Sequence, residues 1–256
     1  MNRPRRRPTE AGRAALALYA GSPPAVRVHV HVRWWSAPFA QVAAALPPSG
    51  RILEIGCGHG LFAAYAALSE PGRTLVGVDI DANKITQAQA AASRASAGWP
   101  AEAHGAGQSR SGPRLTFEVA ESGAVPPGPW DAVAIVDMLY LLPAIEQRRL
   151  LAEAVAELAP GGLLVVKEMG TGPRWKYRWN TWQETLAVRV LRITEGSSFD
   201  FVAPAVMAGW LHDLGLTTTT RRLDCGRLHP HHLLVGKRVA READSNGSGG
   251  RALTST

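Results

Sequence analysis

Cysteine is scarce in this sequence, and its scarcity excludes one class of protein. Only Cys57 and Cys225 occur among 256 residues, which is too few for the disulfide framework of a small secreted domain. Uncharged apolar runs are also short, and none approaches the roughly 20 residues that a membrane-spanning helix requires. The Arg-rich start is not followed by the apolar segment of a secretory signal. We therefore expect a reducing, cytoplasmic setting.

A metal-binding pattern is missing as well. His229, His231 and His232 lie close together, but adjacent residues of a strand point to opposite faces of a sheet. No pattern of cysteine or carboxylate residues completes a set of zinc ligands around them. We expect no metal site.

Acidic residues are outnumbered by basic ones. The chain has 28 Lys and Arg against 21 Asp and Glu, a formal net charge of +7. Five arginines and two prolines stand within the first 13 residues, a composition that predicts a disordered basic tail over residues 1–13. The excess charge leaves contact with anionic lipid or with nucleic acid open besides a solvated tail.

The rest of the chain is long enough for one substantial core. Residues 14–50 are expected to form an N-terminal extension or lid, with short helices at Ala11–Tyr19 and Phe39–Leu46. Between these helices, Val alternates with Arg or His from Val26 to Trp35. This period of two predicts an extended, half-buried segment in which His29 and His31 share one face.

From residue 51 onward, apolar and amphipathic segments alternate at intervals typical of βαβ units, which predicts a core domain over residues 51–238. Arg94–Arg114 has no clear period and predicts a variable loop. A helical cap is expected at about residues 172–200, and a disordered tail at residues 239–256. The expected strands are Ile52–Ile55, Leu75–Asp79, Leu115–Ala120, Trp130–Val136, Leu163–Lys167, Thr217–Cys225 and His231–Lys237, and the expected helices are Leu61–Leu68, Ala82–Ala92, Ile145–Leu158 and Ala203–Leu214.

The glycine loop after the first expected strand lacks the G-x-G-x-x-G spacing of dinucleotide-binding proteins. Its glycines stand at positions 56, 58 and 60, so the third comes one position early. Glu54 adds a carboxylate that can hold a cationic ligand group. Asp79 ends the next strand, about 20 residues past the glycines, where a carboxylate can accept hydrogen bonds from both ribose hydroxyls.

Four segments in order resemble the motifs of class I S-adenosylmethionine-dependent methyltransferases: Leu53–Gly60, Leu75–Asp81, Trp130–Asp137 and Leu158–Val166. The resemblance implies a doubly wound (Rossmann-like), mostly parallel seven-stranded α/β sheet with an antiparallel edge strand. It also implies S-adenosylmethionine as the cofactor, with the methionine part at the glycine loop, the ribose at Asp79 and the adenine at Ile80. Glu121 stands where the family often has the Asp that contacts the adenine amino group. The implied cofactor-binding residues are Glu54, Gly56, Gly58, Gly60, Asp79, Ile80, Glu121 and Asp137.

Methyl transfer from a sulfonium is an in-line displacement in which alignment supplies much of the acceleration, so a base is optional. For a hydroxyl acceptor, the candidate bases are Tyr140 after the fourth strand and Glu168 after the fifth. Four tryptophans are candidates either for packing or for the wall of an apolar acceptor site: Trp34, Trp35, Trp175 and Trp179. The basic residues next to and between Trp175 and Trp179 would bind an acidic headgroup or a membrane surface.

We therefore expect methyl transfer to a small or lipid-like molecule, with oxygen slightly favoured as the acceptor atom, release of S-adenosylhomocysteine and peripheral contact with a membrane. A nucleic-acid methyltransferase, acting for example on RNA, is the alternative suggested by a pI of about 10.0. Against it, Asp137–Tyr140 lacks the Asn/Asp-Pro-Pro-aromatic motif of many base-amino methyltransferases. A protein that binds S-adenosylmethionine without turnover is a second alternative. The sequence indicates no oligomeric state.

Overall fold

A single mixed sheet of seven strands forms the centre of the molecule in the computed structural model, which describes residues 8–97, 114–121, 124–169, 200–223 and 231–239. The strand order is β3-β2-β1-β4-β5-β7-β6. Neighbouring strands from β3 to β5 run parallel, and β7 is antiparallel to both β5 and β6. The expected fold class is confirmed. The strands are β1 (Ser49–Ile55), β2 (Gly72–Asp79), β3 (Arg114–Val119), β4 (Trp130–Val136), β5 (Leu158–Met169), β6 (Leu216–Arg222) and β7 (His231–Arg238).

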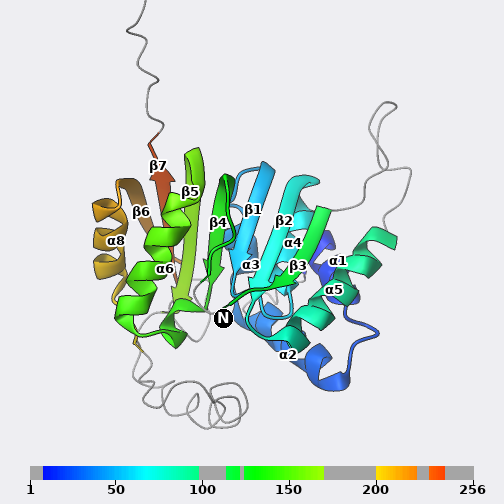
Figure 1. Cartoon of the computed structure of the whole chain (residues 1–256). Coiled ribbons are helices and arrows are strands. Elements are labelled where there is room, and N and C mark those ends of the chain that lie inside the picture. The colour runs from blue at the N-terminus through cyan, green and yellow to red at the C-terminus, as the bar shows by residue number, and fades with distance from the viewer. Residues whose placement is uncertain (1–7, 98–113, 122–123, 170–199, 224–230, 240–256) are drawn as a thin grey trace, which may run out of the picture.

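Helices cover both faces of this sheet. One apolar core joins the sheet to α1–α5, and a second joins it to α6 and α8. In Figure 1, α6 and α8 lie on the left of the molecule, and α1, α2 and α5 lie on the right. The helices are α1 (Glu10–Ala17), α2 (Pro24–Ser36), α3 (Phe39–Ala43), α4 (Leu61–Ser69), α5 (Ala82–Ala97), α6 (Ala144–Ala156) and α8 (Pro204–Asp213), with a 3-10 turn η1 (Leu139–Leu141).

The strand β1 shows how the sequence fixes these layers. Successive side chains of a strand point to opposite faces, and Ile52 accordingly packs in the core of α1–α5, whereas Leu53 packs in the core of α6 and α8. The following helix α4 is buried from Leu61 to Ala67. Its alanines leave room for the sheet on one side and α1 and α3 on the other.

The chain reverses its direction of travel across the sheet at β1. It moves outward from β1 to β2 and β3, and then returns to the other side of β1 with β4. The carboxyl ends of β1 and β4 therefore flank a topological switch point, the place where open α/β sheets bind their ligands. This edge faces downward in Figure 1, and α2 lies below it.

The largest correction to the sequence prediction concerns Val26–Trp35, which is not extended but forms most of α2. Pro24 occupies the first turn, where its missing N–H costs no hydrogen bond. The residues that face the molecule follow the helical spacing i, i+3, i+4, i+7 and i+8: Val26, His29, Val30, Arg33 and Trp34. The alternation of valine with polar residues favoured the strand period of two and made the helical period harder to recognise.

Several boundaries also differ from the prediction. The helix α1 begins at Glu10, one residue before the expected helix Ala11–Tyr19 and within the range 1–13 expected as a tail, with Thr9 as its N-cap. The helix α5 continues to Ala97, so the expected variable loop at Arg94–Arg114 begins with helical residues and ends within β3. The expected cap and most of both expected tails lie outside the described residues.

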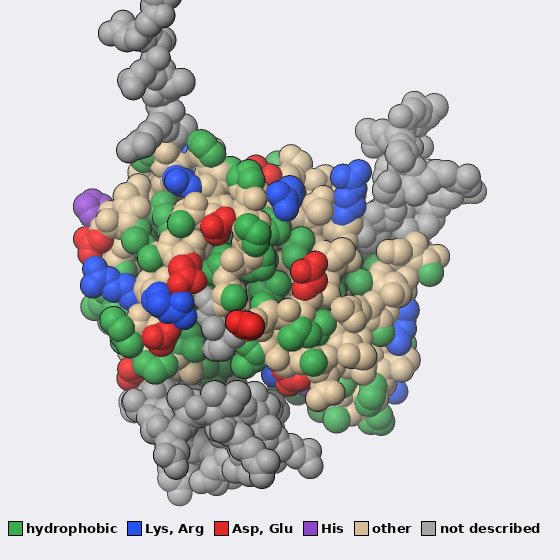
Figure 2. All heavy atoms as spheres, in the orientation of Figure 1, with side chains coloured by type: hydrophobic (Ala, Val, Ile, Leu, Met, Phe, Trp, Pro, Cys, Tyr) green, Lys and Arg blue, Asp and Glu red, His purple; other side chains and the backbone are tan. Residues whose placement is uncertain are grey.

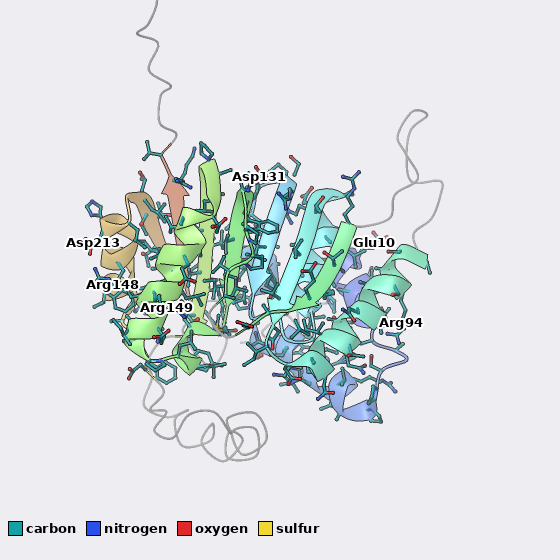
Figure 3. The ribbon with its side chains drawn as sticks, in the orientation of Figure 1. Glu10, Arg94, Asp131, Arg148, Arg149 and Asp213 are labelled. Carbon is teal, nitrogen blue, oxygen red and sulfur yellow. The ribbon has the colours of Figure 1, made fainter. Side chains whose placement is uncertain are left out.

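Two polar contacts fasten segments that are distant in the sequence, and Figure 3 labels one residue of each. Arg94 of α5 donates to the carbonyl of Leu18 at 2.6 Å, which ties the end of α1 to α5. At the amino edge of the sheet, the carboxylate of Asp131 accepts the backbone N–H of Arg51 at 2.7 Å and joins β4 to β1. No helix of the described ranges is long and apolar enough to cross a membrane.

Candidate functional site

The glycine loop between β1 and α4 has a backbone that only glycine accommodates easily. Gly56, Gly58 and Gly60 have φ angles of +73°, +55° and +77°, where a side chain is strained. A Cβ on Gly60 would lie 2.3 Å from the Phe117 ring, whereas one on Gly58 would meet no atom within 4 Å. The loop is therefore packed at its end and open at Gly58, where a ligand can approach the backbone.

Asp79 at the end of β2 holds this loop in place. One carboxylate oxygen accepts the N–H of Gly58 at 2.8 Å, and the other accepts the N–H of Asp81 at 2.9 Å. Each carboxylate oxygen has two lone pairs, so both retain capacity for a ribose hydroxyl. The geometry thus fits the ribose contact predicted for Asp79.

Apolar surface lies beside this carboxylate. Ile80 follows β2 and is 52% exposed, and Val119 ends the neighbouring strand β3 and is 55% exposed. Glu121, two residues past Val119, is also exposed. An adenine ring against Ile80 with its amino group near Glu121 would cover these side chains, so their placement fits the predicted adenine contacts.

Glu54 has a structural contact that the sequence did not indicate. Its Oε2 accepts the N–H of Ala63 in the first turn of α4 at 3.0 Å, so it caps a helix whose N-cap residue, Gly60, has no side chain. Burial raises the pKa of Glu54 to about 8. A cationic ligand group nearby would favour the ionised form, as the prediction for Glu54 requires.

The helix α2 lies across the switch point. Its Arg33 donates to the carboxylate of Asp137, just past β4, at 3.0 Å. One turn earlier, the ring of His29 lies 4.8 Å from the ring of His59 in the glycine loop. Tyr19, between α1 and α2, donates its hydroxyl to the carbonyl of His59 at 2.6 Å. The N-terminal extension is therefore in contact with both sides of the crevice.

Protonation would disturb this contact. Burial and the neighbouring His59 lower the pKa of His29 to about 4, and burial also lowers the pKa of His59. Both rings are consequently neutral near pH 7, which allows α2 to sit against the glycine loop without repulsion between like charges.

A buried ion pair lies beneath Arg33. Lys167 of β5 has no exposed side-chain surface, and its ammonium contacts one oxygen of the Asp137 carboxylate. Burial alone would raise the pKa of Asp137, but the charges of Lys167 and Arg33 outweigh it and hold that pKa below its ordinary value. Both oxygens of Asp137 are thus engaged by cations and only 1% of its side chain is exposed, so its contact with the cofactor stays a prediction.

Glu168 lies one residue further along β5. Its Oε1 accepts the N–H groups of Met138 and Leu139 at 3.2 and 2.9 Å, and its Oε2 is buried with no hydrogen-bond partner among the described residues. Burial and the charge of Asp137 raise the pKa of Glu168 to about 8. Met138 also faces the glycine loop, because a Cβ on Gly56 would lie 2.4 Å from its Cγ. Met138 therefore contacts Glu168 through its backbone and the glycine loop through its side chain.

Tyr140, the other candidate base, is buried and stacked on Phe201 with ring centroids 5.4 Å apart. Burial raises the pKa of Tyr140 above its ordinary value, so its phenol stays protonated. The geometry consequently favours Glu168 over Tyr140 as a proton acceptor.

Trp34 and Trp35 have different surroundings. Trp34 packs edge-on against Phe39 and Tyr65, at centroid distances of 6.1 and 5.1 Å. Trp35 is 55% exposed, because adjacent residues of a helix point about 100° apart. Their place in the wall of an acceptor site stays a prediction. Trp175 and Trp179 lie outside the described residues, and their substrate contacts stay predictions.

These features together define a class of protein. A doubly wound sheet with a glycine loop after β1 and a ribose-accepting carboxylate after β2 is a Rossmann-like fold that binds an adenine nucleoside at its switch point. The open backbone at Gly58 and the exposed Ile80 are the places that such a ligand would cover.

Comparison with known proteins identifies the family. Residues 29–220 match the family model described as "Methyltransferase domain", and the chain belongs to this family. It is a class I S-adenosylmethionine-dependent methyltransferase, as the sequence motifs predicted, and S-adenosylmethionine is its cofactor. No curated protein matches the sequence significantly.

Solved structures share the fold at low sequence identity. An O-methyltransferase family protein from Burkholderia thailandensis is 20% identical with a TM-score of 0.57, and the match covers 82% of this chain but only 57% of that protein. Magnesium protoporphyrin IX methyltransferase from Synechocystis PCC 6803, solved with bound S-adenosylhomocysteine, is 16% identical with a TM-score of 0.58, covering 90% of this chain and 95% of that one. The CurJ carbon methyltransferase is 18% identical with a TM-score of 0.56, and the match covers 88% of this chain and 58% of that one.

Sequence reasoning missed Arg33 as a partner of Asp137 and Tyr19 as a contact of the glycine loop, and for His29 it favoured a solvated face over a place near the site in a lid. The helical spacing within Val26–Trp35, together with Pro23-Pro24 as a helix start, is the signal that could have placed His29 and Arg33.

Proposed function

We propose that this protein transfers the methyl group of S-adenosylmethionine to an oxygen atom of a small or lipid-like molecule. The observation that carries the proposal is Glu168, a buried carboxyl with one oxygen that lacks a hydrogen-bond partner among the described residues. A hydroxyl acceptor must lose a proton as it reacts, and a carboxylate with a pKa of about 8 is well matched to accept it near neutral pH.

The chain's residues divide the task between binding and proton transfer. Asp79 would accept the ribose hydroxyls and Ile80 would pack on the adenine, while the open backbone at Gly58 leaves room for the methionine part. Arg33 would bind the methionine carboxylate, because its guanidinium lies at Asp137, just past β4, and 28% of its side chain is exposed. These contacts would fix the sulfonium at the switch point.

When bound, the cofactor supplies an electrophilic methyl group on a positively charged sulfur. Transfer of this group to an acceptor oxygen would break the carbon–sulfur bond, leave its electron pair on sulfur and release S-adenosylhomocysteine. The carboxylate of Glu168 would take the proton of the acceptor hydroxyl. Alignment of oxygen, carbon and sulfur supplies most of the acceleration, and proton transfer adds roughly 10² to 10⁴-fold.

The acceptor is tested by incubating the protein with S-adenosylmethionine labelled in its methyl group and with separate lipid and aqueous extracts. We expect label in a product whose methyl group is attached to oxygen, and its loss in Glu168→Gln. Label on carbon or nitrogen would remove the O-methyl assignment, and label in added RNA would favour the nucleic-acid alternative. Binding of the cofactor without any labelled product would favour a non-catalytic protein.

A further inference from the structure

The outward face of α2 is an exposed apolar stripe. Val28, Val32 and Trp35 are 64%, 59% and 55% exposed. Their spacing of i, i+4 and i+7 places them on one side of the helix. The opposite side of the same helix carries His29 and Arg33, which contact the crevice. The helix α2 therefore has one face for the site and one apolar face that points away from it.

Other exposed apolar side chains lie at the same edge of the molecule. Ile80 and Val119 stand at the carboxyl ends of β2 and β3, and Leu141, 40% exposed, lies just past β4. Figure 2 shows hydrophobic side chains at the lower right rim, where Figure 1 places α2. Monomeric soluble domains rarely gather large apolar side chains at one exposed edge unless that edge binds a partner or a membrane.

The charged residues around the apolar stripe of α2 help to decide between a protein partner and a membrane. The helix α2 contains no acidic residue, and its exposed polar side chains next to the stripe are Arg27 and His31. No Asp or Glu occurs between Ala11 and Leu53, and the whole chain carries a net charge of +7. An apolar stripe bordered by basic side chains complements a surface that is apolar inside and negatively charged outside, as an anionic lipid bilayer is.

We infer that α2 is an interfacial helix that docks the protein on an anionic lipid surface. Val28, Val32 and Trp35 insert among the upper acyl chains, and Arg27 contacts the phosphate groups. This orientation turns the carboxyl edge of the sheet, and with it the crevice, toward the lipid. The inference concerns where the protein sits and does not depend on oxygen being the methylated atom.

The test uses the full chain and two kinds of vesicle, phosphatidylcholine alone and phosphatidylcholine mixed with phosphatidylglycerol. The variant is Val28→Glu/Val32→Glu, and the matched control is Val239→Glu, because Val239 has the same exposure as Val28, 64%, but follows β7 at the opposite edge. We expect the wild type and the control to co-sediment with the anionic vesicles, and the double variant to partition at least about tenfold less. Unchanged binding of S-adenosylmethionine by calorimetry would show that the double variant is folded.

Three results would overturn the inference. The first is that the wild type binds neither vesicle. Binding equally strong in the double variant would assign the interaction to charge alone, elsewhere on the chain. A wild type that ignores vesicles but forms dimers that the double variant lacks would assign the stripe to a second copy of the chain. None of these results bears on methyl transfer, which the labelling experiment tests separately.

Discussion

Arg33 offers the sharpest test of the proposed cofactor site, because no motif in the sequence pointed to it. Its guanidinium donates one hydrogen bond to Asp137 at 3.0 Å, and 28% of its side chain remains exposed at the switch point. Lys167, the other cation that pairs with Asp137 among the described residues, is fully buried. If the methionine carboxylate is bound at the switch point, Arg33 is the residue available to bind it.

The expected magnitude follows from the degree of burial. Fully exposed ion pairs contribute about 0–1 kcal/mol, and losing one partner of a buried pair costs about 3–5 kcal/mol. Arg33 is between these limits, so removing its contact should cost about 1.5–3 kcal/mol, the scale of a charge-assisted hydrogen bond. This corresponds to binding that is about 10-fold to about 150-fold weaker.

The assay compares two ligands with two proteins. Arg33→Met keeps an unbranched apolar side chain and removes the guanidinium, which lies over the Phe39 ring at 5.8 Å from its centroid. Calorimetry would measure the binding of S-adenosylhomocysteine and of its decarboxylated analogue, which keeps the amine and the nucleoside. We expect the substitution to weaken the first ligand by the factor above and to change the second by less than about threefold.

Two outcomes would refute the reasoning. If both ligands lose affinity equally, Arg33 acts only by holding α2 against Asp137, and the carboxylate is bound elsewhere. If neither changes, Arg33 does not contribute to the cofactor site. Failure of the wild type to bind S-adenosylhomocysteine at all would instead count against the proposed function, and circular dichroism of both proteins would detect misfolding.

Three further predictions concern the carboxylates. Asp79→Ala should weaken binding of S-adenosylmethionine by about 1.5–3 kcal/mol. The control Asp81→Ala, which removes the cap of α5, should weaken this binding less. Equal losses of binding free energy by calorimetry would contradict the ribose contact of Asp79. The methyl transfer rate should rise as pH passes through about 8, because only ionised Glu168 accepts a proton. Glu168→Gln should abolish that rise. A rate that does not change from about pH 7 to about pH 9 would exclude Glu168 as the base. Asp137→Asn should lower the free energy of unfolding by about 3–5 kcal/mol, because it leaves buried Lys167 without a carboxylate. Adding Lys167→Met should restore part of the lost stability. If urea unfolding shows the double variant to be no more stable than Asp137→Asn, the ion pair of Lys167 and Asp137 does not stabilise the fold.

The sheet could be predicted from the sequence because its signals are local. Each parallel strand is a short apolar run bounded by a turn, and the glycine loop and Asp79 mark the ends of β1 and β2 without knowledge of other segments. The antiparallel pair of β6 and β7 was predicted in the same way. The chemistry of the cofactor site follows from these strand ends, since the fold brings them to one edge.

The extension and the charges at the switch point could not be predicted in this way. Val26–Trp35 satisfies two periods, and besides the helix start at Pro23-Pro24, the contacts of Val30 and Trp34 with other helices favour the helical one. The partner of Asp137 is equally hidden, because Lys167 and Glu168 are adjacent and both could pair locally. The register of β4 against β5 brings Val136 beside Lys167, which places the Lys167 ammonium on Asp137 and leaves Glu168 for the backbone of Met138.

The contacts of the N-terminal extension also determine when it can fold. Arg33 and Asp137 are separated by 104 residues, and Tyr19 and His59 by 40. During synthesis, α2 leaves the ribosome early, but its ion-pair partner exists only after β4 has been made, and the buried cation beneath that partner only after β5. Contacts between distant segments cost more loop entropy and form late. The helix α2 can therefore complete its ion pair at the switch point only after β4 and β5 have been synthesised, although it is among the first segments made.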